Sequence, residues 1–272
     1  MSSAMEVEVA SRLARSAGQL ILAQREDGDL AVGTKARDEV VTSADRAADR
    51  LVHEGLAVEF PDDAVYSEET PDSGTRLARR RVWIVDPLDG TSTYVTGGDE
   101  FCVSIGLAVD GRPTVGAVFN PCRDELVAGA IGQGITFNGA PARVSDVDHL
   151  ARARLSTSRR DVTRGLVPEL GAASVTVVAS MAYKLARVSA GLDDATLSAV
   201  PRKEWGTCAG VALVLAAGGM ATLLDGTEIR YNRSELRQPV GMVAAGPALH
   251  AELLAALAAG PTPPCGWDEL SV

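Results

Sequence analysis

Two aspartates three positions apart, Asp86 and Asp89, carry the clearest chemical signal in the sequence. Pro87 lies between them and restricts the local backbone, so that both carboxylates can converge on one hard cation. An Asp-Pro-x-Asp-Gly segment is also a good turn that needs no ligand. The Gly-Thr-Ser segment at 90–92 favours a ligand site over a simple turn, because free backbone N–H groups at an expected helix start can bind an anion. A carboxylate-bound metal and a phosphate could therefore meet here.

Other acidic residues stand where they could join this pair. Glu68 and Glu69 follow a short apolar run, and Asp45 stands at an expected helix start. Taken singly, each is most simply a solvated surface acid. Together with Asp86 and Asp89 they could bind magnesium, which prefers a few carboxylates, several waters and substrate phosphate oxygens. Two such ions can stabilise the attacking and leaving oxygens of an in-line displacement at phosphorus.

The elements expected around these acids place them at strand ends and at a helix start. Apolar residues recur at helical spacings over residues 7–24, which predicts an amphipathic helix. A hydroxyl at Thr42 or Ser43 can cap a second helix. Short β-type runs at 64–67 and 81–85 each end directly in carboxylates. Charged groups that leave two strand ends indicate a site at the edge of a sheet.

The later elements predict more sheet and then a second α/β portion. Further strands are expected at 101–109, 114–119 and 125–130, as an antiparallel meander. Residues 204–217 should form a helix closed by a glycine in the left-handed conformation. A change to polar, arginine-rich sequence after Val144 suggests a boundary near residue 150. We expect residues 1–150 to form an N-terminal α+β lobe with most metal ligands, and residues 151–272 a C-terminal α/β lobe with substrate contacts.

Composition restricts the partners. The chain has 272 residues, of which 46% are apolar, so it can bury a substantial core. Its formal net charge of −10 argues against binding to nucleic acid polymers or anionic membranes. The four cysteines match no zinc spacing and are expected to be reduced thiols. With no signal-like start and no run of roughly 20 apolar residues, we expect a cytoplasmic protein.

Positive charge collects in the second half of the chain. Lys184 and Arg187 could contact a second phosphate or a base, or could simply line a solvated helix face. Arg160 and its neighbour at 159 follow three hydroxyl residues and are another candidate phosphate contact. The basic group is completed by Arg202, Lys203 and Arg233. Basic residues that face an acidic, metal-binding lobe would suit a small anionic phosphorylated substrate.

The motifs in their order resemble the inositol monophosphatase superfamily. The resemblance rests on residues 30–45 with Lys35, on Ser67-Glu68-Glu69-Thr70, on the run from Trp83 to Thr91, and on Glu204-Trp205-Gly206-Thr207-Cys208-Ala209-Gly210. Trp205 itself is expected to be a packing anchor. Within the superfamily, Tyr183-Lys184, Ala190-Gly191 and Tyr231-Asn232-Arg233 resemble the bacterial 3′-phosphoadenosine 5′-phosphate phosphatases more than the inositol enzymes. The resemblance implies a layered α-β-α-β-α sandwich of the inositol monophosphatase and fructose-1,6-bisphosphatase type.

The resemblance also implies the site. The metal ligands would be Glu68, Asp86, the Leu88 carbonyl and Asp89, with Asp45 assisting. Two or three Mg²⁺ ions are expected. Thr91, paired with Glu68 or Asp45, would orient the attacking water, so Glu68, Thr91 and Asp45 are the expected catalytic residues. Substrate contacts are expected from Gly90, Thr91, Ser92, Lys184, Arg233 and Glu204.

Gly206 departs from the family pattern, in which a Trp-Asp-x-x-Ala-Gly motif provides an aspartate to the second metal. Glu204 would replace that aspartate poorly from within a helix, where residues two apart point in nearly opposite directions, but this objection weakens if Glu204 precedes the helix. We expect a magnesium-dependent phosphoric monoester hydrolase acting first on 3′-phosphoadenosine 5′-phosphate or a related bisphosphorylated nucleoside. The alternatives are an inositol or sugar monophosphate phosphatase, and a catalytically impaired relative that binds a phosphorylated ligand. Relatives include monomers and homodimers.

Overall fold

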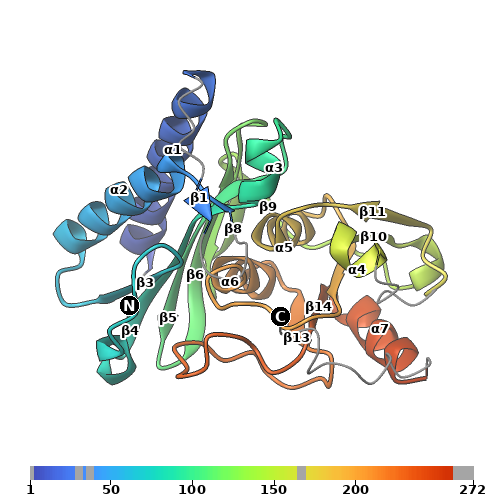
Figure 1. Ribbon diagram of the computed structural model, residues 1–272. Helices are drawn as coiled ribbons and strands as arrows, with labels where there is room; N and C mark the ends of the chain where they lie inside the picture. Colours follow the sequence, from blue (N-terminus) through green and yellow to red (C-terminus); the bar gives the residue numbers. More distant parts are fainter. Residues whose placement is uncertain (1–2, 28–32, 35–39, 164–169, 260–272) are drawn as a thin grey trace.

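The computed structural model describes residues 3–27, 33–34, 40–163 and 170–259. Lys35 and one of the four cysteines, Cys265, lie outside these ranges. Within them the chain forms two main sheets and a two-stranded ladder of β1 (Gly33–Thr34) and β2 (Val40–Val41). The sheets and helices alternate as layers, as the sequence resemblance implied (Figure 1).

The first sheet has seven strands, which pair in the order of the chain. They are β3 (Ala64–Ser67), β4 (Arg81–Asp89), β5 (Cys102–Val109), β6 (Arg112–Asn120), β7 (Glu125–Ala130), β8 (Gly134–Phe137) and β9 (Ala140–Ala142). Strands β3 and β4 are parallel, and each later pair is antiparallel, which confirms the predicted meander. Strand β4 does not end before Asp86 as expected. It continues to Asp89, with a shift in register against β5 between the two aspartates.

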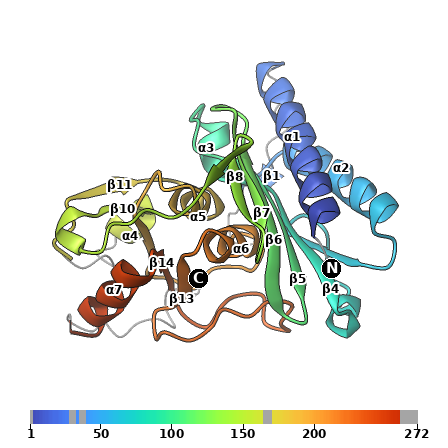
Figure 2. The same cartoon turned by 180° about the vertical axis from the view of Figure 1, so that it is seen from behind.

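Helices α1 (Ala4–Glu26) and α2 (Ser43–Glu59) cover one face of the first sheet (Figure 2). Helix α1 buries Val9, Leu13, Ala17 and Ile21, which recur every four residues and form one face. Helix α2 begins with a capping box, because the Thr42 hydroxyl and the Asp45 side chain bond each other's backbone N–H groups. Both predicted helices are thus confirmed.

Helices α5 (Met181–Ser189) and α6 (Cys208–Ala216) lie between the two main sheets (Figure 1). Helix α6 is apolar all round because both of its sides are covered. Gly106 and Gly116 let it approach the first sheet closely, since a Cβ at Gly116 would lie 2.3 Å from the carbonyl oxygen of Ala209. The predicted glycine closure is present at Gly218, where φ is 84°. The helix begins at Cys208, however, so Glu204 precedes it.

The second sheet pairs its strands in the order β11-β10-β12-β14-β13. They are β10 (Arg154–Thr157), β11 (Ser174–Val177), β12 (Ala195–Ser198), β13 (Met220–Leu223) and β14 (Met242–Ala245). The remaining elements are α3 (Thr91–Val95), α4 (Arg159–Thr163), α7 (Pro247–Ala259) and two 3₁₀ turns, η1 (Thr75–Ala78) and η2 (Leu150–Arg152). Helix α7 packs against β13 and β14 as the last layer.

Three cysteines lie in the described ranges, and all three, Cys102, Cys122 and Cys208, are free thiols there. Burial raises the pKa of Cys102 and of Cys208 well above the ordinary thiol value. No helix in the described part of the chain is long and apolar enough to cross a membrane.

Candidate active site

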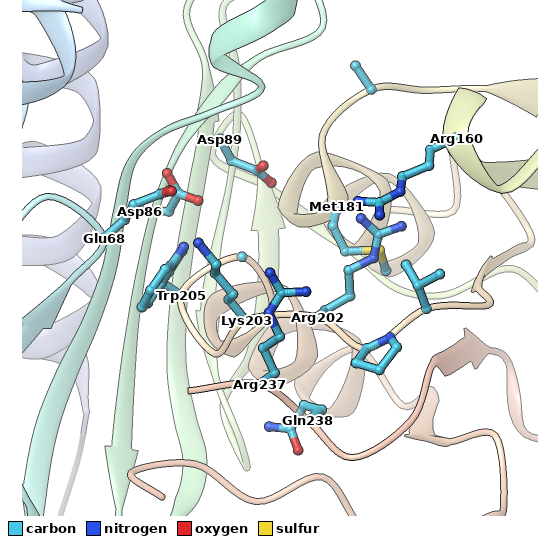
Figure 3. Close-up of a pocket in the computed structure, with 14 residues that line it drawn as sticks. Glu68, Asp86, Asp89, Arg160, Met181, Arg202, Lys203, Trp205, Arg237 and Gln238 are labelled. Carbon is cyan, nitrogen blue, oxygen red and sulfur yellow. The ribbon is translucent and has the colours of Figure 1, made fainter. Parts of the chain in front are cut away.

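A cavity of about 390 Å³ opens beside the carboxyl ends of β3 and β4. Its acidic residues are Glu68, Asp86 and Asp89, and its basic residues are Arg160, Arg202, Lys203 and Arg237. Figure 3 shows the acidic groups on the side of the first sheet, the Arg160 and Arg202 guanidinium groups on the opposite side, and Lys203 between them beside Trp205. We call these two sides the acidic wall and the basic wall. Two oppositely charged walls suit a ligand that combines a cation-neutralised phosphate with further negative charge.

The acidic wall is built by the parallel pairing of β3 with β4. Ser67 lies opposite Val85, and the Glu68 N–H donates to the Val85 carbonyl at 3.2 Å, so Glu68 comes next to Asp86. Asp86 is only 3% exposed. Its burial first, and then the negative charges of Glu68, Asp89 and Asp45, raise its pKa well above the usual carboxyl value. This repulsion is the kind that a bound cation relieves.

Asp45 and Thr91 meet at the inner end of the acidic wall. The Thr91 hydroxyl lies 3.2 Å from Asp45 Oδ1 and 3.0 Å from the Leu88 carbonyl oxygen, and donates toward both. The other Asp45 oxygen accepts from the Thr42 backbone N–H at 2.8 Å and from the Thr42 hydroxyl at 2.6 Å. The structure therefore brings together Thr91 and Asp45, which the resemblance had paired.

Asp89 reaches across to helix α5. Its Oδ2 accepts from the Ser180 hydroxyl at 2.6 Å and from the Ala182 N–H at 2.8 Å. Ser180 also caps α5 by accepting from the Tyr183 N–H at 3.0 Å. Sequence reasoning missed Ser180. A serine before an apolar helical run signals a helix start, but nothing local signals that the same hydroxyl binds Asp89.

The fit of these residues to magnesium can be tested on their chemistry. Among the described residues, no group of three His, Cys, Asp or Glu side chains is arranged as a metal site as it stands. Asp45 and Asp89 have turned toward hydroxyl and backbone donors instead. The donor set is nevertheless of the hard oxygen type that Mg²⁺ binds, with three carboxylates at one cavity. The residues therefore fit magnesium in kind.

The first turn of α3 stands next to this wall. Gly90 has φ 102°, and a Cβ there would lie 2.9 Å from the Glu100 carbonyl oxygen, so glycine is required at this position. Thr91 and Ser92 open α3 directly after it. None of these three residues is part of the cavity lining, although Thr91 touches Asp45 behind it.

Lys184, Arg233 and Glu204, three of the expected substrate contacts, also lie outside the lining of this cavity. Lys184 is fully buried and donates to the Val178 carbonyl at 2.9 Å, and burial lowers its pKa to about 7. The Arg233 guanidinium is near the Arg237 carbonyl at 3.3 Å.

The Glu204 carboxylate forms hydrogen bonds within the protein. Its two carboxylate oxygens accept the backbone N–H groups of Asn232 at 2.8 Å and Arg233 at 3.0 Å. Burial raises its pKa to about 7, while these two N–H groups act in the opposite direction. It precedes α6, and both of its oxygens are directed to these backbone groups.

The basic wall comes from three separate segments of the second half of the chain. Arg160 belongs to α4, Arg202 and Lys203 lie between β12 and α6, and Arg237 lies between β13 and β14. Sequence reasoning named the first three as candidates and missed Arg237. Its only signal is a basic stretch, and such stretches are usually solvated surface.

Trp205 and Gly206 form the floor where the two walls meet. Trp205 is 7% exposed and packs edge-to-face on Tyr66, with ring centroids 5.4 Å apart, so it is a packing anchor that also lines the cavity. The Lys203 ammonium lies 4.9 Å from its ring centroid. A Cβ on Gly206 would have only the Lys203 carbonyl oxygen nearby, at 3.9 Å. The cavity thus has room for a side chain at position 206, where the chain has glycine.

Comparison with known proteins agrees with this architecture. Residues 4–261 match the inositol monophosphatase family. Inositol monophosphatase 3 of Solanum lycopersicum is 34% identical over 236 residues, which are 82% of this chain and 87% of the relative. The Nus factor SuhB of Pasteurella multocida is 31% identical over 264 residues, 91% of this chain and 94% of the relative.

Solved structures show the same fold over nearly the whole length. The extragenic suppressor protein suhB of Bartonella henselae superposes with a TM-score of 0.82 at 27% identity and covers 96% of this chain and 100% of its own. The inositol monophosphatase of Anabaena superposes with a TM-score of 0.77 at 29% identity, over 97% and 98% of the two chains. The chain therefore belongs to the inositol monophosphatase family.

Proposed function

We propose that this chain hydrolyses a small phosphate monoester with Mg²⁺ in the cavity between the acidic and basic walls. One observation carries the proposal: Glu68, Asp86 and Asp89 line one side of a cavity whose other side carries four basic residues. The carboxylates supply cation ligands, and the basic residues supply contacts for an anion that a chain of net charge −10 would otherwise repel.

Glu68, Asp86, Asp89 and the Leu88 carbonyl would hold two or three magnesium ions, with help from Asp45. When bound, magnesium neutralises phosphoryl oxygens and makes water a better nucleophile. The Thr91 hydroxyl donates toward Asp45 and Leu88, so its oxygen lone pairs can accept a hydrogen bond from a water molecule and orient that water. Asp45 keeps the threonine in this orientation. No covalent nucleophile is required.

The basic wall favours a substrate with more than one anionic group. We therefore keep 3′-phosphoadenosine 5′-phosphate or a related bisphosphorylated nucleoside as the first candidate. Inositol or sugar monophosphates are the second, and the names of the relatives favour them. Gly206 motivates a third possibility, a phosphate-ligand binder without turnover. We also propose a cytoplasmic monomer or homodimer whose lobes divide near residue 150.

Phosphate release across a magnesium titration tests the proposal. The substrates are 3′-phosphoadenosine 5′-phosphate, inositol 1-phosphate and fructose 1,6-bisphosphate. We expect magnesium-dependent release that Asp86→Asn abolishes, with the bisphosphorylated nucleoside preferred. Preference for inositol 1-phosphate would assign the chain to the second candidate. Binding of these compounds without release at any magnesium concentration would overturn the proposed turnover and support the binder.

A further inference from the structure

The Arg202 guanidinium is fixed at the cavity by hydrogen bonds to two buried side chains. Its Nε donates to the Ser198 hydroxyl at 2.6 Å, and its Nη2 donates to Asp161 Oδ2 at 3.0 Å. Ser198 and Asp161 are both fully buried, and the Arg202 side chain is 22% exposed where it lines the cavity. These bonds occupy Nε and Nη2, so Nη1 is the atom best placed to meet a ligand.

Among the described residues Asp161 forms one ion pair, with Arg202 at 3.0 Å, and its complete burial is otherwise costly to the fold. Its Oδ2 also accepts from the Ser158 hydroxyl at 2.7 Å, which fixes the carboxylate at the start of α4. Its Oδ1 is buried and has no hydrogen-bond partner among the described residues. A buried acceptor without a partner is unfavourable for folding. A buried carboxylate that lowers stability while it holds one side chain at a cavity is typical of a functional site.

Basic side chains gather at this corner of the cavity. Arg160 lines the same cavity as Arg202, and Arg237 lies on the same wall. Figure 3 shows the Arg160 and Arg202 guanidinium groups at the end of the cavity away from Glu68 and Asp86. A planar guanidinium binds phosphate oxygens with two parallel N–H groups, which an ammonium cannot do.

We propose that Arg202 and Arg160 bind a second phosphate of the substrate, and that Asp161 is the positioning residue that fixes Arg202 for this contact. The inference rests on the proposed function and deepens it. The acidic wall takes the phosphate that is cleaved, and the far end of the basic wall takes one that is kept. The substrate class is then a small bisphosphorylated molecule, and a monophosphate that lacks the second group leaves Arg202 without its ligand.

Substrate pairs that differ only in the second phosphate test this assignment. The pairs are 3′-phosphoadenosine 5′-phosphate with adenosine 3′-monophosphate, and fructose 1,6-bisphosphate with fructose 1-phosphate.

Asp161→Asn keeps the size of the side chain but removes its charge. We expect it to raise KM for the preferred bisphosphate about tenfold, the change that corresponds to one lost charge-assisted contact, with kcat almost unchanged. Arg202→Met should raise this KM further, and both variants should raise KM for the matching monophosphate much less than KM for the bisphosphate.

Arg187 and Asp193 provide a matched control. They also form an arginine–aspartate ion pair, here through two hydrogen bonds of 2.8 and 2.9 Å, but neither lines the cavity. Asp193→Asn should therefore leave both members of each substrate pair unchanged. If Asp161→Asn does not fold, judged by circular dichroism, Ser198→Ala removes the other bond that holds Arg202 and should give the same selective rise in KM.

Calorimetric binding in the presence of a chelator separates this inference from the proposed function. A chain that releases no phosphate but loses bisphosphate affinity selectively in Arg202→Met would contradict the turnover and support the second-phosphate site. An active chain in which Asp161→Asn and Arg202→Met raise KM equally for bisphosphate and monophosphate would overturn the inference and leave the proposed function intact.

Discussion

The Ser180 hydroxyl donates to Asp89 Oδ2 at 2.6 Å and thereby joins the start of helix α5 to the end of strand β4. The same hydroxyl accepts from the Tyr183 N–H and so caps the helix. One small side chain thus fixes a carboxylate of the acidic wall and the helix that separates the two sheets. The position of Asp89 is set by the second half of the chain as much as by its own strand.

Ser180→Ala should therefore affect both stability and activity. Loss of a helix cap and of a bond to a carboxylate should lower the free energy of unfolding by ~1–3 kcal/mol. Because Asp89 loses its partner, kcat/KM should also fall, by about tenfold for a loss of one such contact. Urea denaturation and phosphate release measure the two effects.

Two variants separate these effects. Ser180→Thr keeps the hydroxyl and should stay close to the wild type in activity. Ser189→Ala removes a buried hydroxyl from the other end of the same helix, where it donates to the Ala186 carbonyl at 2.7 Å. It should lower stability but not kcat/KM. Equal activity losses in Ser180→Ala and Ser189→Ala would show that helix stability alone, and not Asp89, is responsible.

Glu204 should make the protein less stable as pH rises from about 4.5 to about 7. Burial raises its pKa from 4.5 to about 7 in the folded state. The unfolded chain therefore releases this proton at lower pH than the folded chain, and stability is lost over that window. The contribution is at most ~3 kcal/mol. Unfolding free energies at pH 5 and pH 8 should differ less in Glu204→Gln than in the wild type, and an unchanged difference would contradict the assignment.

Lys184 should act in the opposite direction at higher pH. Burial lowers its pKa from 10.5 to about 7 in the folded state, so the unfolded chain binds a proton that the folded chain does not. The resulting loss of stability grows as pH falls from about 10.5 to about 7 and is at most ~5 kcal/mol.

Lys184→Met keeps the length of the side chain and removes the titrating group. Its unfolding free energy should lack the rise that the wild type shows between pH 7 and pH 9. The carbonyl of Val178 loses its donor in this variant, which lowers stability by a similar amount at both pH values. An identical pH dependence in the two proteins would show that Lys184 does not titrate in this window.

Local features of the site could be predicted because a few neighbouring residues encode them. Thr42 and Asp45 are three apart, the spacing of a capping box, and the structure has that box. The acids that follow β3 and continue β4 come together because the two strands are parallel neighbours. The alternation of apolar and polar residues and the helix caps are properties of short segments, so these elements can be predicted from the sequence.

The partners of the buried charged residues could not be predicted in the same way. Lys184 has the spacing of an exposed helix position, but α5 lies between two sheets and has little solvent-facing surface. Glu204 bonds backbone groups 28 and 29 positions away. The basic wall joins Arg160 from helix α4 with Arg202 and Arg237 from two separate loops. Such contacts depend on how the layers of helices and sheets stack, and a short segment of the sequence does not determine this.

Gly206→Asp should strengthen magnesium binding. The position lines the cavity, its φ is compatible with other residues, and the nearest atom to an added Cβ is 3.9 Å away, so the side chain fits without strain. One further carboxylate should raise the Mg²⁺ affinity measured by calorimetry about tenfold. In chelator, the added negative charge next to Asp86 should lower the free energy of unfolding, since the repulsion is then uncompensated. Gly206→Asn has nearly the same shape without the charge and should show neither effect. If Gly206→Asp and Gly206→Asn bind Mg²⁺ equally, the missing carboxylate at this position does not limit the metal site. If phosphate release rises together with affinity in Gly206→Asp alone, the glycine is what restrains turnover in this chain.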